Sequence, residues 1–451
     1  MSKEVYEKVN REPTGLDMRR VIPIFLMVFV DMLGLTVVLP LLHLYAAVHG
    51  AGPLEVGAVL AAFPLAQLIG VPMMGALSDR YGRRPLLLIS QVTTCISFIM
   101  LGLANSLALI IVSRLFDGLF GANIATAQAA LSDITDASNR ARGLGITGAA
   151  FGLGFIFGPA IAILSFELTD SLAVPAFTAA LYSFLSILIT TFMFKETHPP
   201  ERRGGASSSG IGPVTLFRYL ARPFVGFLLL LMFAQQFIFF GFESLLGLFT
   251  LTRLGFLGAG NAALFLFVGI ILVIVQMRAI GPWSNRFGEG RLVVAALFLL
   301  ALGLLLAGTT PEQPHPFYVR ELVARDLMAG APTRAQTLIG DLRVQLPANG
   351  NNGPAGVLWL ALALVPISVG AALIRPALNS LITRSVGDNE YGSALGVSSA
   401  LVSAANASAP LLAGFLFQQL GSSAPFAIGG ALMAALCVAS LSLSRRGPRG
   451  A

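Results

Sequence analysis

Residues 75–88 read Gly75-Ala-Leu-Ser-Asp-Arg-Tyr-Gly-Arg-Arg-Pro-Leu-Leu-Leu88, a short charged stretch between two long apolar runs. It holds four charged side chains in a chain where only 11% of residues are charged. Gly82 permits a backbone conformation that a side chain would disfavour, and Pro85 suits the first turn of a helix. The stretch is predicted to be a basic loop between two membrane helices. A solvated loop that only sets membrane orientation would explain the charge but not the spacing.

The composition indicates an integral membrane protein. The 451 residues are 55% hydrophobic, with a mean hydropathy of +0.80, which is more than a soluble core requires. The net charge of +7 sits in short loops, a pattern of membrane topology rather than of nucleic-acid binding. The two cysteines, Cys95 and Cys437, both lie in apolar runs, so no disulfide framework is expected.

Twelve apolar runs are predicted to be transmembrane helices, because lipid cannot satisfy free backbone groups. They lie near residues 21–45, 54–77, 86–104, 107–131, 143–165, 173–194, 223–249, 259–282, 291–309, 355–382, 392–419 and 423–443. The expected fold class is therefore an all-α integral membrane protein with twelve transmembrane helices in two pseudo-symmetric six-helix bundles. Lysine and arginine concentrate in one set of loops, which includes residues 75–88 and both termini. By the positive-inside rule these parts are predicted to be cytoplasmic, in a multi-pass protein of the inner (cell) membrane.

The domain organisation is predicted from loop composition. Residues 1–194 form an N-terminal six-helix bundle, residues 195–222 a cytoplasmic linker and residues 223–451 a C-terminal six-helix bundle. The linker is rich in proline, glycine and serine, as flexible tethers are. The second bundle contains an extracytoplasmic insertion at 311–353, within which 317–330 could form an amphipathic helix. A tolerated surface loop is favoured there over a lid or a docking surface.

The two halves repeat weakly. Gly75-Ala-Leu-Ser-Asp-Arg-Tyr-Gly82 aligns with Gly281-Pro-Trp-Ser-Asn-Arg-Phe-Gly288 at an offset of 206 residues (281 − 75). Pro159 aligns with Pro410 at an offset of 251 (410 − 159). The difference of 45 residues (251 − 206) is the length expected of the insertion, so the second half reads as a copy of the first with one added loop.

Several motifs together resemble the major facilitator superfamily over essentially all twelve spans. The stretch 75–88 is similar to that family's loop between spans two and three. Asp31-Met-Leu-Gly34 with Pro40 resembles the span-one motif of proton-coupled drug exporters, and Arg114-x3-Gly118 resembles the span-four motif. The resemblance implies the major facilitator fold and proton-coupled export.

Two further motifs narrow the resemblance to antiporters, specifically the tetracycline-resistance exporters. The span-five antiporter motif is matched by Gly145-x8-Gly154-x3-Gly158-Pro159. The loop of tetracycline exporters between spans four and five is similar to the stretch from Asp133 to Arg142. The glycines would allow close helix packing, and the proline can kink the span.

The sequence departs from these patterns in three ways. Ala162 and Ile163 stand where the span-five motif usually closes with two glycines, and Asp117 stands where a glutamine is common. Spans 86–104 and 291–309 lack the acidic residues that tetracycline exporters carry there. These departures argue against tetracycline itself as the compound, but not against proton-coupled export.

Four charged residues within spans are the candidates for proton coupling: Asp31, Arg114, Asp117 and Glu243. Asp31 lies about ten residues into span one, hence about 15 Å deep and near the midplane. Burial favours the neutral form of a carboxylate, so Asp31 is the first candidate proton carrier; a permanently paired structural carboxylate is the alternative. Arg114 must face protein or water, paired with Asp31 or with Asp117. Glu243 could be a second protonation site, attract a cation, or only face water.

Polar amides within spans are weaker candidates, for lining a substrate cavity: Gln67, Asn123, Gln235 and Gln236. Such amides more often bond between helices. His43 and His49 lack metal-ligand spacing with other residues, so no metal site is expected.

A cytoplasmic gate is predicted from the loop motif and its repeat. The resemblance implies that Asp79 faces the start of span eleven and that Arg83 reaches Asp133. The offsets map Arg83 onto Glu289 (83 + 206) and Asp133 onto Arg384 (133 + 251), which predicts two ion pairs of opposite polarity; coincidental loop charges are the alternative. The gate set is Gly75, Asp79, Arg80, Gly82, Arg83, Arg84, Asp133, Asn285, Glu289 and Arg384.

The predicted function is export of a small hydrophobic or amphipathic, drug-like compound in exchange for protons by alternating access. A proton symporter or uniporter of a sugar or metabolite is the alternative, and a transporter-like membrane receptor is a remoter one. No enzymatic constellation and no cofactor site is found. The expected partners are the small-molecule substrate, protons and the lipid bilayer, with no nucleic acid, and the protein is expected to function as a monomer.

Overall fold

The computed structural model is built of helices, and the residues that it describes contain no strand. The described residues are 18–135, 140–167, 171, 173–198, 213–329, 344–387, 390–441 and 443. Helices correspond to all twelve predicted spans. They are α2 (Met18–Val38) with η1 (Leu39–Leu41) and α3 (Leu42–Val48), α4 (Pro53–Tyr81), α5 (Arg83–Gly102), α6 (Leu107–Phe120) with α7 (Asn123–Asp133), α8 (Arg140–Glu167), α9 (Ala173–Phe192), α11 (Pro223–Leu254), α12 (Gly258–Arg278) with α13 (Ile280–Phe287), α14 (Glu289–Gly308), α16 (Ala355–Arg384), α17 (Tyr391–Leu420) and α18 (Ala424–Ala439).

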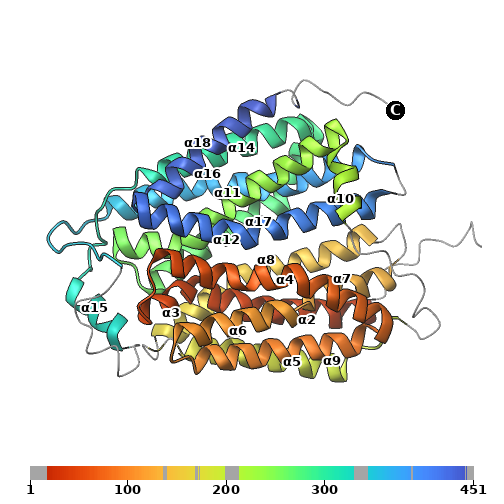
Figure 1. Cartoon of the computed structure of the whole chain (residues 1–451), viewed down its shortest axis with the longest axis horizontal. Helices are drawn as coiled ribbons and strands as arrows, with labels where there is room; N and C mark the ends of the chain where they lie inside the picture. Colours follow the sequence, from red (N-terminus) through yellow and green to blue (C-terminus); the bar gives the residue numbers. More distant parts are fainter. Residues whose placement is uncertain are drawn as a thin grey trace, which may run out of the picture.

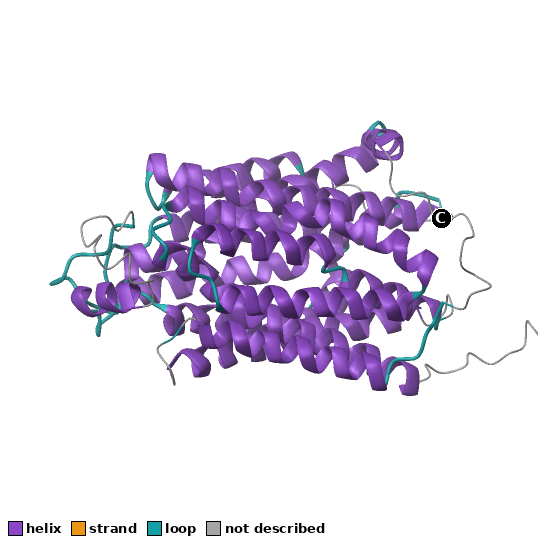
Figure 2. Cartoon of the chain, turned by 60° about the horizontal axis from the view of Figure 1, so that its bottom comes forward, coloured by secondary structure: helices purple, strands orange, loops and turns teal. Residues whose placement is uncertain are grey.

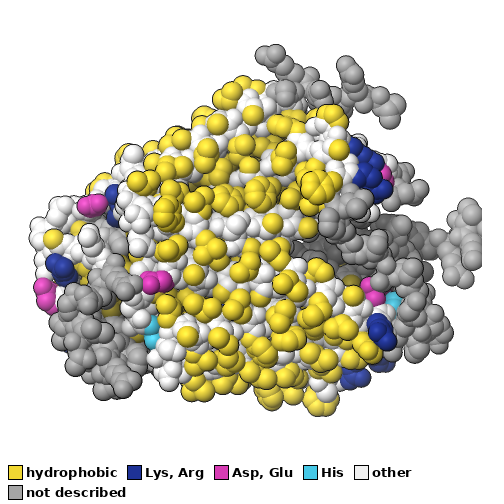
Figure 3. Space-filling model, in the orientation of Figure 1, with side chains coloured by type: hydrophobic (Ala, Val, Ile, Leu, Met, Phe, Trp, Pro, Cys, Tyr) yellow, Lys and Arg dark blue, Asp and Glu magenta, His cyan; other side chains and the backbone are white. Residues whose placement is uncertain are grey.

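Within the described ranges, ten helices are long and apolar enough to cross a membrane. Two shorter apolar helical segments, Ala149–Ser165 of α8 and Ala424–Ala439, fill the remaining two predicted positions. Large hydrophobic side chains are exposed over the outer faces of the helices, and Figure 3 shows them covering the molecule between two ends that carry charged residues. This surface is what a lipid-facing belt requires.

Three predicted spans are broken rather than continuous; the eighth breaks at Ala279, between α12 and α13. The first changes to a 3₁₀ turn at Leu39–Leu41, because Pro40 lacks the N–H that an α-helix needs. The fourth breaks between Phe120 and Asn123. There the hydroxyl of Ser90 on α5 donates to the Phe120 carbonyl at 2.7 Å and accepts from the Ala122 N–H at 2.7 Å. The Ala122 N–H also donates to the Phe120 carbonyl at 2.9 Å, so Ser90 adds to the hydrogen bonding of the backbone groups that the break takes out of the helix ladder.

The helices form two groups that follow the order of the chain. Figure 1 shows α2 to α9 in the lower group and α11, α12, α14, α16, α17 and α18 in the upper group. The main contacts between the groups pair α4 with α17 and α8 with α12. The exact domain boundaries at 194 and 223 stay a prediction, since much of the predicted linker, residues 199–212, lies outside the described residues.

The two ends of the molecule differ. The arginine-rich end is where α4, α12 and α16 end, each with an arginine in its last turn: Arg80, Arg278 and Arg384. The loop end carries α3 and the helix α15 (Arg320–Ala329). At the loop end the groups are joined, because Asn261 Nδ2 donates to the Pro40 carbonyl at 2.6 Å. Two other contacts lie there. The Leu54 N–H on α4 donates to Gln418 Oε1 on α17 at 3.3 Å. The backbones of the same two helices also approach closely at Gly57, where an added Cβ would lie 2.3 Å from the Pro410 carbonyl oxygen. Figures 1 and 2 show the ribbons of the two groups diverging from this end toward the other.

The insertion at 311–353 is packed against the loop end in its described part. Its helix, α15, falls within the predicted 317–330. Tyr318 is 2% exposed and covers Gly255, the left-handed residue (φ +69°) that ends α11. The Tyr318 hydroxyl donates to the Pro347 carbonyl at 2.8 Å. Buried side chains therefore anchor the described part of the insertion, and the expectation of a tolerated surface loop rather than a lid or a docking surface stays a prediction; residues 330–343 lie outside the described residues.

Candidate functional site

A cavity of about 660 Å³ lies within the second group of helices. Its walls come from α11, α12 and α16, with Phe155 of α8 closing one side. The polar lining residues are Gln235, Gln236, Glu243, Gln276, Ser368, Arg375 and Asn379. Four phenylalanines, Phe155, Phe239, Phe242 and Phe265, add apolar wall. Such a site can hold a drug-sized molecule and orient it through a few polar groups.

Helical periodicity puts these side chains on common faces. On α11 the lining positions are 235, 236, 239, 242, 243 and 246, and on α16 they are 367, 368, 371, 374, 375, 376 and 379. Spacings of three and four residues place side chains on one face of a helix. The lining reaches the arginine-rich end, since Gln276 is two residues from the end of α12 and Asn379 is five from the end of α16. The cavity therefore extends toward that end.

Two charged residues of opposite sign line this cavity. Glu243 is half-buried and Arg375 is exposed to the cavity interior. Neither has a hydrogen bond or an ion pair among the described residues. Sequence reasoning identified Glu243 but missed Arg375. The signal was present, because an arginine inside the apolar run of α16 must face protein or water and is a site candidate by default.

The predicted cavity amides divide between the two groups. Gln235 and Gln236 line the cavity, and Gln236 Nε2 donates to Asn406 Oδ1 on α17 at 2.8 Å. Gln67 on α4 and Asn123 on α7 are not among its lining residues. The Oδ1 atom of Asn123 is buried and has no hydrogen-bond partner in the described part of the chain.

Asp31 also lies outside this cavity, within the first group. Its Oδ1 atom is buried and, among the described residues, accepts no hydrogen bond. Arg114 does not pair with it: the Arg114 Nη1 atom lies 3.5 Å from Asp117 Oδ2, and its Nη2 atom donates to Ser97 Oγ at 2.8 Å. The alternative of an Arg114–Asp31 pair is therefore wrong for this conformation. Asp117 is held further by the Thr94 hydroxyl, at 2.8 Å.

The span-five motif joins α8 to α2. A Cβ on Gly154 would lie 2.6 Å from Met32 Cβ, and one on Gly158 would lie 1.9 Å from Thr36 Oγ1. Met32 follows Asp31 directly, and Phe155, which lines the cavity, follows Gly154. The seam therefore connects the neighbourhood of Asp31 to the cavity wall. Gly145 and Pro159 both lie within α8, and the surroundings of Gly145 are outside the described side chains.

The stretch 75–88 forms the predicted turn at the arginine-rich end. Gly82 has φ +105°, and Gly288 at the repeated position has φ +77°, so both turns use a backbone that favours glycine. No atom of the described residues comes within 4 Å of a Cβ built on Gly75. The Glu196 carboxylate accepts from the N–H groups of Arg83 and Arg84, at 2.9 and 3.1 Å, and caps the positive end of α5.

Both predicted ion pairs are present. Arg83 Nε lies 2.9 Å from Asp133 Oδ2, and Arg384 Nη2 lies 2.8 Å from Glu289 Oε1. Each pair lies within one group of helices, so neither bridges the two groups in this conformation.

The other gate residues have different surroundings. Asp79 pairs with Arg83 at 2.6 Å, so the ion pair that the structure gives it is on its own loop rather than at the start of α17. Arg80 stacks over the Tyr81 ring at 5.4 Å, Arg84 Nη2 donates to the Thr191 carbonyl at 2.6 Å, and Asn285 is exposed. In the described ranges, no cluster of three or more His, Cys, Asp or Glu side chains could hold a metal ion.

Comparison with known proteins gives a family match and distant relatives. The family model of the Major Facilitator Superfamily matches residues 24–322 and 346–451. The tetracycline resistance protein, class C, of Escherichia coli is 27% identical over 400 residues, covering 88% of this chain and 89% of that protein. Multidrug resistance protein 2 of Bacillus subtilis is 25% identical over 412 residues, covering 90% of each. Major facilitator superfamily domain-containing protein 10 of Bos taurus is 28% identical over 446 residues, covering 83% of this chain and 95% of that protein.

Solved structures show the same fold. The crystal structure of the human organic anion transporter MFSD10 superposes with a TM-score of 0.65 at 24% identity, covering 95% of this chain and 100% of that one. The nucleoside transporter NupG superposes with a TM-score of 0.70 at 12% identity, covering 95% of this chain and 99% of that one. These structures support the two-group helical architecture, and at such identities they carry no statement about the compound that this chain handles.

Proposed function

We propose, from the premise that the chain belongs to the Major Facilitator Superfamily, that this transporter exports a small amphipathic compound in exchange for protons. The observation that carries the proposal is the cavity between α11, α12 and α16, which combines phenylalanine walls with charged and amide side chains. The relatives named as tetracycline and multidrug resistance proteins support export as the direction of transport.

The proposed mechanism is alternating access. The two groups of helices touch at the loop end, and the cavity lining reaches the arginine-rich end. We propose that this arginine-rich end faces the cytoplasm of the cell, following the positive-inside rule, so that the cavity receives its compound from inside. Rocking of one group against the other would close that end and open the loop end. The ion pairs Arg83–Asp133 and Glu289–Arg384 would brace the helix ends that meet during closure.

We propose that Asp31 carries the exchanged proton. One of its two carboxylate oxygens, the buried Oδ1 atom, has no hydrogen-bond partner in the described part of the chain, while the side chains of Ser186 and Asn123 interact with the carboxylate. Protonation would lower the cost of burying a charged group that is only partly compensated. The seam of Met32 against Gly154 would transmit this change to Phe155 at the cavity wall. Proton binding and substrate binding would then favour opposite conformations, which is the requirement for exchange. The protein would work as a monomer.

The test is proton-driven flux in proteoliposomes with Asp31→Asn. The variant should lose flux driven by a pH gradient and keep exchange of labelled for unlabelled compound, because the cavity is untouched. Glu321→Gln, on the exposed face of α15, is the matched control and should transport normally. Gradient-driven flux at the wild-type rate in Asp31→Asn would refute the assignment.

A further inference from the structure

The cavity holds two charges of opposite sign that do not neutralise each other. No ion pair joins Glu243 and Arg375, and the described residues give neither of them another charged partner. Both line the same cavity from different helices. Arginine stays charged under all conditions that a protein meets, so this site always presents at least one full charge.

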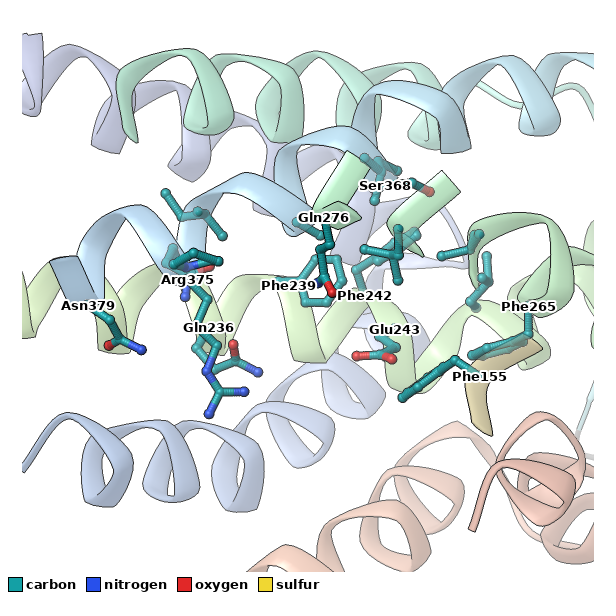
Figure 4. Close-up of a pocket in the computed structure, with 18 residues that line it drawn as sticks. Phe155, Gln236, Phe239, Phe242, Glu243, Phe265, Gln276, Ser368, Arg375 and Asn379 are labelled. Atoms are coloured by element: carbon teal, nitrogen blue, oxygen red, sulfur yellow. The ribbon is translucent and has the colours of Figure 1, made fainter. Parts of the chain in front are cut away.

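The two charges lie at separate places along the cavity. Gln236 and Glu243 are seven residues apart on α11, which is about 10 Å along a helix that rises 1.5 Å per residue. Figure 4 shows Arg375 beside Gln236, while Glu243 lies farther along α11 toward Phe155 and Phe265. Phe239 and Phe242 line the wall between them. Along the cavity wall, the positively charged Arg375 is therefore followed by an aromatic region and then by the negatively charged Glu243.

The closing of the cavity makes this arrangement selective. A charge removed from water without a partner is costly, and both charges lose water when the two groups of helices close around the compound. A purely anionic ligand would satisfy Arg375 and leave Glu243 unpaired. A purely cationic ligand would do the reverse. A ligand that carries both charges, separated by an apolar body, satisfies both residues at once.

We infer that the exported compound is a zwitterionic amphiphile. Its anionic group binds Arg375, with Asn379 one turn farther along α16 as an amide donor. Its aromatic body packs on Phe239 and Phe242, and its amine binds Glu243. The inference rests on the proposed function and names the substrate class of the same cavity.

The experiment measures equilibrium binding to the full chain in lipid nanodiscs, with no gradient, by isothermal titration calorimetry. The probes are an aminomethyl-biphenyl carboxylic acid, its methyl ester (cation), its N-acetyl derivative (anion) and the N-acetyl methyl ester (neutral). We expect the zwitterion to bind at least about tenfold tighter than either singly charged probe, a difference of about 1.4 kcal/mol. Arg375→Gln should abolish its advantage over the cation, and Glu243→Gln its advantage over the anion.

Controls separate charge recognition from misfolding. The neutral probe should bind both variants as it binds the wild type, which shows that the cavity is intact. Arg278→Gln and Glu321→Gln, outside the cavity, should keep the zwitterion preference. Equal affinity for all four probes, or no binding of the zwitterion by the wild type, would overturn the inference. Because binding needs no proton gradient, zwitterion preference without gradient-driven flux would refute proton exchange alone, and flux without the preference would refute the substrate class alone.

Discussion

Replacing Gly158 by alanine is predicted to destabilise the seam between α2 and α8. The new Cβ would lie 1.9 Å from Thr36 Oγ1 and 2.6 Å from Thr36 Cβ. Thr36 cannot rotate away freely, because it is 1% exposed and its hydroxyl is within hydrogen-bonding distance of the Met32 and Gly154 carbonyls, at 2.6 and 2.8 Å. Either that bonding is lost or the two helices must separate.

The magnitude follows from these contacts. Overpacking costs about 1–3 kcal/mol and the lost hydrogen bond about 0.5–1.5 kcal/mol, while the better helix propensity of alanine returns about 1 kcal/mol. The net loss of about 0.5–3.5 kcal/mol should lower the unfolding midpoint of the purified protein by several degrees at a fixed heating rate. Adding Thr36→Ala to Gly158→Ala removes the contact with Thr36 Oγ1 and should reverse part of the decrease in the unfolding midpoint.

The matched control is Gly281→Ala on α13, where no described atom lies within 4 Å of the built Cβ. That variant should unfold at or above the wild-type midpoint, because alanine favours helix more than glycine does. Equal midpoints for Gly158→Ala and Gly281→Ala would refute the reasoning that α8 needs glycine to approach α2.

Two further predictions concern the ends of the molecule. Glu289→Arg and Arg384→Glu should each slow transport and their combination should restore part of the initial rate, because the 2.8 Å pair is rebuilt with its charges exchanged; equal rates in all four proteins would argue against a gating role. Tyr318→Ala should lower the unfolding midpoint in a thermal scan by the equivalent of about 3 kcal/mol, as loss of a buried aromatic ring does, whereas Tyr81→Ala, at a position 50% exposed, should change stability by about 0.5 kcal/mol or less. Equal midpoints for these two variants would show that Tyr318 does not anchor the insertion.

The spans were predictable because lipid imposes length and apolarity on every crossing helix. The turn at Gly82 and its copy at Gly288 were predictable too, since glycine, proline and charge mark them locally. The break after Phe120 was not, because its backbone groups are satisfied by Ser90 on a different helix. Long-range hydrogen bonds of this kind leave no pattern in the sequence.

The site was predictable only in part. Helices that are apolar on all faces give no period that fixes their rotation, so the sequence could not tell that Gln236 faces the cavity and Gln67 does not line it. The sequence allowed Arg114 to pair with either Asp31 or Asp117, and only the packing of the helices shows that it pairs with Asp117. Arg375 could have been predicted, because a charged residue inside an apolar span must face protein or water and is therefore a candidate site residue.

The most direct test of proton-coupled export is to record proton and substrate movement in the same proteoliposomes. The wild-type protein is reconstituted around a trapped pH-sensitive dye, and an outward gradient of the zwitterionic probe is imposed without a pH gradient. The account predicts that protons enter as the probe leaves, so the lumen acidifies, and that Asp31→Asn abolishes the acidification. Probe efflux with no pH change, or with alkalinisation of the lumen, would contradict it.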